Sequence, residues 1–163
     1  MYVKEKCNTC VISDKRARVT GELTPVRAEH SLTYHDNENY AAARSIDLDF
    51  GTHSWTLGSD SNAWLKLTLD QVYCVEQIVR YGDDGSTFAT WTCSQTDCTA
   101  CEGDRCGDYS LTVSSVGAVL PDNLPPVTDC KYGDTVKLEE TSGGSSMVFE
   151  IAITRKQGEI THW

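Results

Sequence analysis

The stretch Trp64-Leu-Lys-Leu-Thr-Leu69, followed by Val72-Tyr-Cys-Val-Glu-Gln-Ile-Val-Arg-Tyr81, decides the fold class. In its first half every second residue is a leucine, at Leu65, Leu67 and Leu69, and the residues between them are polar. A period of two is typical of a β-strand that buries one face and exposes the other. The stretch therefore predicts two strands, and apolar residues alternate in the same way elsewhere in the chain.

The remaining segments fit an all-β, antiparallel sandwich or barrel. Further strand candidates are residues 16–23, 109–116, 135–138 and 146–154. Clusters of Gly, Asp, Ser and Pro separate them, at residues 82–85, 121–126 and 142–145. No helix longer than 39–45 is indicated. Short strands with such turns are typical of sandwiches, but periodicity alone does not distinguish an immunoglobulin-like sandwich from a jelly roll.

Length and composition indicate one soluble domain. The chain has 163 residues, enough to bury its own core, and we expect a single domain over residues 1–163. Its net charge of −10 argues against binding nucleic acid and favours cations. No stretch approaches the ~18 apolar residues of a membrane span, so membrane insertion is not expected. The first residues contain no apolar signal region, which we interpret as a mature or excised extracellular segment.

Eight cysteines indicate an oxidising, extracellular setting. The set is Cys7, Cys10, Cys74, Cys93, Cys98, Cys101, Cys106 and Cys130. Two C-x-x-C pairs also permit a zinc site, but the four other cysteines and the even count favour disulfides. We expect a Cys74–Cys130 disulfide between layers and a self-bridged, Cys-rich loop over residues 93–106.

Motifs for catalysis are missing from the sequence. There is no H-x-x-x-H spacing, no G-x-S-x-G turn and no glycine-rich phosphate loop. Adjacent carboxylates at Asp83-Asp84 and Glu139-Glu140 are expected to be solvated turn residues rather than an acid/base pair. The sequence therefore predicts a binding module and not an enzyme.

A possible cation loop lies between residues 47 and 52. Asp47 and Asp49 are two residues apart and are followed by Gly51 and Thr52, so carboxylate and carbonyl oxygens could surround Ca²⁺. The same pattern is typical of an ordinary Asx turn, and the residues by themselves leave both interpretations open.

The region from Ala41 to Tyr81 resembles the F-type lectins, or fucolectins. It contains Ala-Ala-Ala-Arg-Ser-Ile-Asp-Leu-Asp-Phe-Gly-Thr-His-Ser-Trp over residues 41–55, then the two strand segments quoted above. These match the family series A-x-D-G-N, T-H-T, P-W-W-x-V-D-L and Y-x-I-x-x-V-x-I-Y. More loosely, the region is similar to discoidin-like domains. The resemblance implies a jelly-roll β-sandwich of the galactose-binding-like type that binds carbohydrate and holds a structural Ca²⁺.

The resemblance also implies a set of calcium ligands. These would be the Arg44 carbonyl, the Asp47 side chain, the Asp49 carbonyl, an oxygen near Thr52, the Phe149 carbonyl and the Glu150 carboxylate. Strand alternation places Glu150 on the face away from Met147, Phe149 and Ile151, as a ligand at a sheet edge requires. Leu48 stands where the family has glycine, so a positive φ at this position would oblige the loop to be rebuilt.

The ligand site implied by the resemblance combines His53 with the cysteine-rich segment. His53 corresponds to the family's sugar-binding histidine, Asp97 to its aspartate and Arg105 to its second arginine. Gln95 replaces the first arginine, and a neutral amide lacks the charge-assisted hydrogen bonds of a guanidinium. Trp91, beside the loop, is predicted to be exposed at its mouth as a ligand-stacking residue.

Two functions follow from these observations. The first is an extracellular carbohydrate-recognition module that binds a glycan, with fucosylated glycans as the family's ligands. The second is a cell-surface adhesion or protein-interaction module in which the sugar site has degenerated, and Gln95 favours this alternative. Trp64, which opens the first strand, is predicted to lie in the core in either case.

Overall fold

The structure is a computed structural model that describes residues 15–57, 62–94, 98, 100–102, 109–117, 120, 124 and 129–156, the side chains of 100–102 excepted. Its strands are β1 (Glu22–Leu23), β2 (Arg27–His30), β3 (Ser54–Trp55), β4 (Trp64–Tyr81), β5 (Thr87–Thr92), β6 (Ala100–Glu102), β7 (Tyr109–Ser114), β8 (Lys131–Glu140), β9 (Met147–Val148) and β10 (Glu150–Arg155). Single turns of 3₁₀ helix form η1 (Tyr34–Asp36), η2 (Glu38–Tyr40) and η3 (Ala42–Ser45).

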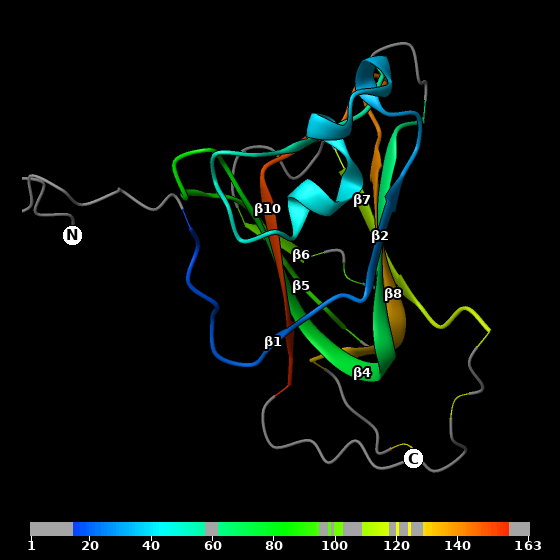
Figure 1. The fold of residues 1–163 in the computed structure, drawn as a ribbon. Helices are drawn as coiled ribbons and strands as arrows, with labels where there is room; N and C mark the ends of the chain where they lie inside the picture. The colour runs from blue at the N-terminus through cyan, green and yellow to red at the C-terminus, as the bar shows by residue number, and fades with distance from the viewer. Residues whose placement is uncertain are drawn as a thin grey trace, which may run out of the picture.

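The long strand β4 belongs to both layers of an antiparallel β-sandwich. Its first half pairs with β2 and β8, and β8 continues to β7. Its second half pairs with β10 and β5, which continue to β1 and β6. The pairing with β8 shifts register between Thr68 and Tyr73, around the exposed Asp70 and Gln71. There β4 bends from one layer into the other (Figure 1), so the two strands expected at 64–69 and 72–81 are one continuous element.

The predicted fold class is therefore confirmed, while several local expectations are wrong. The helix expected at 39–45 consists of 3₁₀ turns, because Ala41 is extended, at a φ of −60° and a ψ of 154°, and separates η2 from η3. Of residues 16–23 only Glu22–Leu23 pairs as a strand. Within the described ranges, no helix is both long and apolar enough to cross a bilayer.

The core lies between the two layers and contains the predicted leucines of β4. Leu65, Leu67 and Leu69 are each at most 3% exposed. Trp91 is 2% exposed and packs in this core, which corrects its prediction as an exposed ligand-binding residue. The reason is strand alternation, since Ala89, Trp91 and Cys93 share the inward face of β5 and its end.

Trp64 was predicted to be a core residue and is instead half-buried on the outer face of β4. It alternates with Leu65, so its ring points away from the leucines. The ammonium groups of Lys66 and Lys137 lie 5.8 Å and 5.7 Å from its ring centroid. The tryptophan thus covers the stems of two lysines on the outer surface of the sheet.

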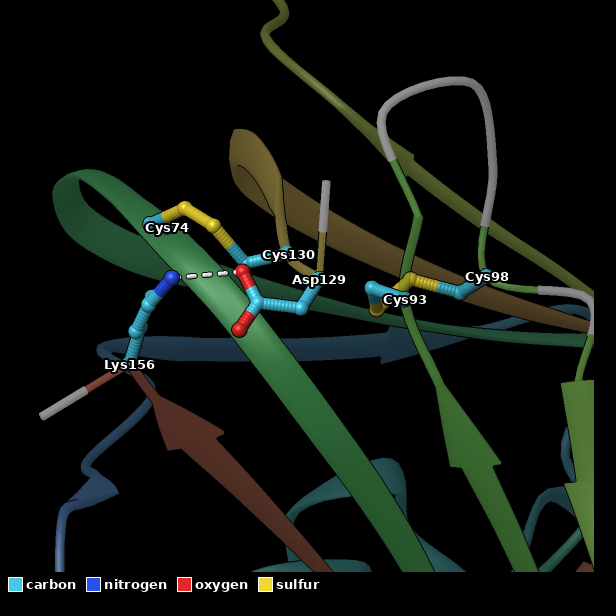
Figure 2. The surroundings of a disulfide bond; sticks show 6 residues. All are labelled: Cys74, Cys93, Cys98, Asp129, Cys130 and Lys156. Carbon is cyan, nitrogen blue, oxygen red and sulfur yellow. Dashed lines mark hydrogen bonds and ion pairs between the residues drawn. A yellow bond between two sulfur atoms is a disulfide. The ribbon is translucent and has the colours of Figure 1, made fainter. Parts of the chain in front are cut away.

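Two disulfides are present in the described part of the chain. Cys74–Cys130 has the predicted pairing, but it links β4 to the residue before β8, which pairs with β4 at this point, and so it does not join two layers. Cys93–Cys98 closes a short loop within the cysteine-rich segment. Figure 2 shows both, with the ion pair between Lys156 and Asp129, 2.6 Å apart, beside the first. Cys7, Cys10, Cys106 and the side chain of Cys101 lie outside the described residues.

The two disulfides differ in sequence separation, which is 56 residues for Cys74–Cys130 and 5 for Cys93–Cys98. Removing a disulfide restores loop entropy to the unfolded chain, by about 4 kcal/mol for the long loop and about 2 kcal/mol for the short one. We expect Cys74→Ser with Cys130→Ser to lower the free energy of unfolding more than Cys93→Ser with Cys98→Ser. Urea denaturation measures both, and equal losses would contradict the expectation.

Candidate functional site

A cavity of about 530 Å³ opens where the end of β4 meets the segment before β10. Twelve residues line it: Arg80, Tyr81, Gly82, Asp83, Asp84, Ser86, Phe88, Tyr109, Glu140, Ser145, Met147 and Phe149. They come from the second half of β4, the β4–β5 turn, the starts of β5 and β7, the end of β8 and residues 145–149. The cavity thus combines four aromatic side chains with four charged ones.

Arg80 is a buried, positively charged residue of this cavity. It is 6% exposed, and its guanidinium carbon lies 4.0 Å from the Phe88 ring centroid and 4.5 Å from that of Tyr109. One guanidinium nitrogen donates to the Met147 carbonyl, 2.9 Å away, and to the Tyr109 hydroxyl, 3.3 Å away. Such cation–π and hydrogen-bond contacts replace the water that Arg80 loses.

Three carboxylates accompany Arg80. Asp83 and Asp84 are exposed in the β4–β5 turn, which Gly85 closes at a φ of 80°. Hydrogen bonds from Ser86 lower the pKa of Asp84, and its Oδ1 lies 2.9 Å from the Ser86 amide nitrogen. Glu140 is buried and accepts from the Ser142 amide, 2.6 Å away, and from its hydroxyl. The cavity therefore carries more negative than positive charge.

A group of aromatic rings lies next to the cavity and is linked to its lining through Phe149. The His53 ring lies 4.9 Å from that of Phe149 and 5.1 Å from that of Tyr40. Tyr34 stacks on Trp55 at 3.9 Å, with 7° between the planes. Burial lowers the pKa of His53, and its Nε2 is buried without a hydrogen-bond partner among the described residues. His53 thus lies next to the cavity but does not line it.

The predicted calcium loop folds as a closed turn. The Asp47 carboxylate accepts from the Asp49 amide, 3.0 Å away, and from the Thr52 hydroxyl, 2.6 Å away. Arg44 Nη1 lies 3.8 Å from Asp47 Oδ2. Leu48 occupies the left-handed region at a φ of 63°, so the chain keeps the glycine-like conformation despite the side chain. For a residue other than glycine, this conformation costs roughly 1–2 kcal/mol.

Glu150 faces this loop and is fully buried, at 0% exposed. Its Oε1 lies 2.9 Å from Arg16 Nε, and Arg16 also pairs with Glu22 at 2.5 Å. Strand alternation therefore points Glu150 away from Ile151, as predicted, but Arg16 covers it from solvent. Burial raises the pKa of Glu150 to about 8 against the opposing effect of Arg16, and the charge of Asp47 raises it further.

The pair of carboxylates in this region, Asp47 and Glu150, would suit a calcium ion. Glu150 Oε2 is buried without a hydrogen-bond partner, and Asp47 is near enough to disfavour its ionisation. An unsatisfied carboxylate oxygen beside a second carboxylate is a suitable donor pair for a hard cation. Within the described ranges, no three His, Cys, Asp or Glu side chains gather as a metal cluster. Calcium would thus depend on Asp47, Glu150 and carbonyl oxygens.

The structure brings together only part of the ligand site expected from the sequence. Gln95, Asp97 and Arg105 lie outside the described residues, so their predicted roles stay predictions.

The residues that line the cavity were not predicted from the sequence as ligand-binding residues. Asp83 and Asp84 are solvated turn residues, as expected, yet that turn forms the edge of a cavity. The same expectation is wrong for Glu139 and Glu140, which belong to β8, and Glu140 is buried. The signal available in the sequence was the position of Asp83 and Asp84 directly after a long strand, where sandwich loops carry binding residues.

Comparison with known proteins finds similar folds among solved structures. No family model matches the sequence, and no curated protein does. Among solved structures, a fucolectin from striped bass (Morone saxatilis) serum matches with a TM-score of 0.54 at 15% identity, over 82% of this chain and 48% of the fucolectin. A Clostridium perfringens module in complex with GalNAc-β-1,3-galactose matches with a TM-score of 0.53 at 17% identity, over 78% of this chain and 94% of that module.

A chitosan-binding module from a Paenibacillus chitosanase/glucanase also matches, with a TM-score of 0.53 at 12% identity, over 81% of this chain and 95% of that module. Identities this low establish the fold alone. The chain therefore has the β-sandwich fold seen in these matching structures, as the sequence resemblance implied.

Arg16 pairs with two buried carboxylates, so its removal should be costly. Arg16→Met leaves Glu150 without its ion-pair partner and removes one of the two partners of Glu22, which keeps Arg18 at 3.3 Å, and we expect a loss of about 3–5 kcal/mol in the free energy of unfolding. Lys15→Met is the matched control, because Lys15 forms an exposed ion pair with Asp49, and exposed ion pairs contribute little to stability. Adding Glu150→Gln to Arg16→Met should recover part of the loss. Similar denaturation midpoints for the two single variants would refute the buried pairing.

Proposed function

We propose that this chain is an extracellular carbohydrate-recognition module that binds its glycan in the Arg80–Phe149 cavity and does not catalyse a reaction. The observation that carries the proposal is the cavity itself. Its aromatic side chains, Tyr81, Phe88, Tyr109 and Phe149, offer apolar faces for a sugar ring, and its charged groups offer hydrogen bonds to hydroxyls. Size supports it as well, since about 530 Å³ is in the range of small-ligand pockets.

The matching structures support the same class of function. They comprise a fucolectin, a chitosan-binding module and a module in complex with a galactose-containing disaccharide. Each is a binding protein or module by its description, and the sugars differ between them. A fold shared by binders of such different sugars supports glycan binding but does not favour fucose over other sugars.

An extracellular location is supported by the cysteine content. Two disulfides occur in the described part of the chain, and disulfides persist chiefly in oxidising compartments. The alternative function, adhesion through a protein partner, would use the same end of the sandwich with the sugar site lost. The test below separates the two.

A structural calcium ion is part of the proposal. Asp47 and Glu150, with the carbonyl oxygens of Arg44, Asp49 and Phe149 and an oxygen of Thr52, would hold it between the 47–52 loop and the start of β10. Bound there, the ion would supply the positive charge that the unsatisfied Glu150 oxygen lacks. Because Phe149 also lines the cavity, the ion would help to fix one wall of the ligand site.

The glycan site is tested by substituting one aromatic wall. A glycan array should identify ligands for the unmodified chain, and Phe88→Ala should weaken the best of them about ten-fold by calorimetry, because ring stacking contributes roughly 0.5–1.5 kcal/mol. Trp64→Ala is the matched control, since Trp64 is a half-buried aromatic residue outside the cavity lining. No glycan binding at millimolar concentration would favour the adhesion function. If both variants weaken glycan binding equally, the glycan does not bind in this cavity.

Calcium binding should stabilise the folded chain. Ligand that binds only the folded state adds about 2.7 kcal/mol at a hundred-fold excess over Kd, so Tm should be higher in Ca²⁺ than in EDTA. Asp47→Asn should abolish this difference. Asp49→Asn should preserve it, because only the carbonyl of Asp49 is an expected ligand and its carboxylate pairs with Lys15. If Tm is the same in Ca²⁺ and EDTA for the unmodified chain, the site holds no calcium.

A further inference from the structure

The charges around the cavity constrain which saccharide it can accept. Its lining contains three carboxylates, Asp83, Asp84 and Glu140, and one guanidinium, Arg80. None of the three carboxylates forms an ion pair with another described residue. The chain as a whole carries a net charge of −10, so the surrounding field has the same sign. A ligand in this cavity therefore meets an excess of negative charge.

Arg80 does not offset this excess at the opening. It is 6% exposed, and its guanidinium is held between two aromatic rings and donates to the Met147 carbonyl. Asp83 and Asp84 are exposed at the edge, and the hydrogen bonds from Ser86 lower the pKa of Asp84, which favours its ionised form. The Arg80 charge thus lies deep in the cavity, while two of the three negative charges, Asp83 and Asp84, lie where a ligand enters.

The hydrogen-bonding groups at the edge of the cavity also favour a positively charged ligand. An ionised carboxylate accepts hydrogen bonds and donates none, and an ammonium group donates three and accepts none. In an ammonium–carboxylate hydrogen bond both partners are charged, and charge-assisted hydrogen bonds are about twice as strong as those between neutral groups. The aromatic walls attract a cation as well as the C–H face of a sugar ring. Sugars that carry a carboxylate or a sulfate group are negatively charged, so the carboxylates at the cavity edge repel them.

We propose that the cavity selects saccharides with a free amino group, such as oligomers of glucosamine, over their N-acetylated, neutral and acidic counterparts. This inference rests on the proposed function and names the ligand class of that site. Asp83 and Asp84 select the ammonium group, and the aromatic walls hold the ring that carries it.

Calorimetry with two trisaccharides tests the inference. The β-1,4-linked glucosamine trimer should bind about ten-fold more tightly than its fully N-acetylated form, because acetylation removes the charge and two of the three donors. Asp83→Asn with Asp84→Asn should erase this preference. The matched control, Asp70→Asn with Asp129→Asn, makes the same charge change near Cys74–Cys130 and should preserve it (Figure 2 labels Asp129). Added salt should weaken binding of the glucosamine trimer more than binding of the acetylated trimer.

The possible failures are distinguishable. If the acetylated trimer or a neutral glycan binds as tightly, and Phe88→Ala weakens it, the amino-sugar inference is wrong and the proposed function stands. If no glycan binds at all, both are wrong. If a short oligolysine peptide binds the same site as tightly as the glucosamine trimer, the inference is also wrong, because the cavity then requires charge without a sugar ring.

Discussion

The hydrogen bonding of β4 to both layers is the constraint on which the rest of the structure depends. Its first half is paired by β2 and β8 and its second half by β10 and β5, so neither layer can form without it. The bend at Asp70–Gln71 fixes the angle between the layers, and the Cys74–Cys130 disulfide secures β8 just after that bend. The cavity lies at the far end of the same strand, where β4 reaches Arg80 and Tyr81.

The sequence predicted the class of fold because the strand signal of β4 is local. Leu65, Leu67 and Leu69 alternate with polar residues, and that pattern needs no knowledge of distant segments. Its fusion into one strand of 18 residues depends on register with β8 and β10, which a period of two does not encode. Trp64 and Trp91 were misplaced for a related reason, since size and apolarity do not say which face of a strand a residue occupies.

The candidate site was predictable only in part. Asp47 and Glu150 could be paired through the family resemblance, and the structure places them near one another. Arg16 could not be anticipated, because its contact with Glu150 spans 134 residues and has no sequence spacing to reveal it. The cavity was missed for the same reason: its walls come from four separate parts of the chain, and Asp83-Asp84 by itself is indistinguishable from any solvated turn.

The buried ion pair and the cavity are physically joined through two neighbouring residues. Glu150, which pairs with Arg16, follows Phe149 directly and is paired in the sheet with Tyr81, and both Phe149 and Tyr81 line the cavity. The Arg16 guanidinium carbon also lies 5.2 Å from the Tyr81 ring centroid. Because Glu150 is fully buried, its position tolerates little movement, and this restricts both aromatic walls. The segment that carries Arg16, far from the cavity in sequence, therefore contributes to the shape of the cavity.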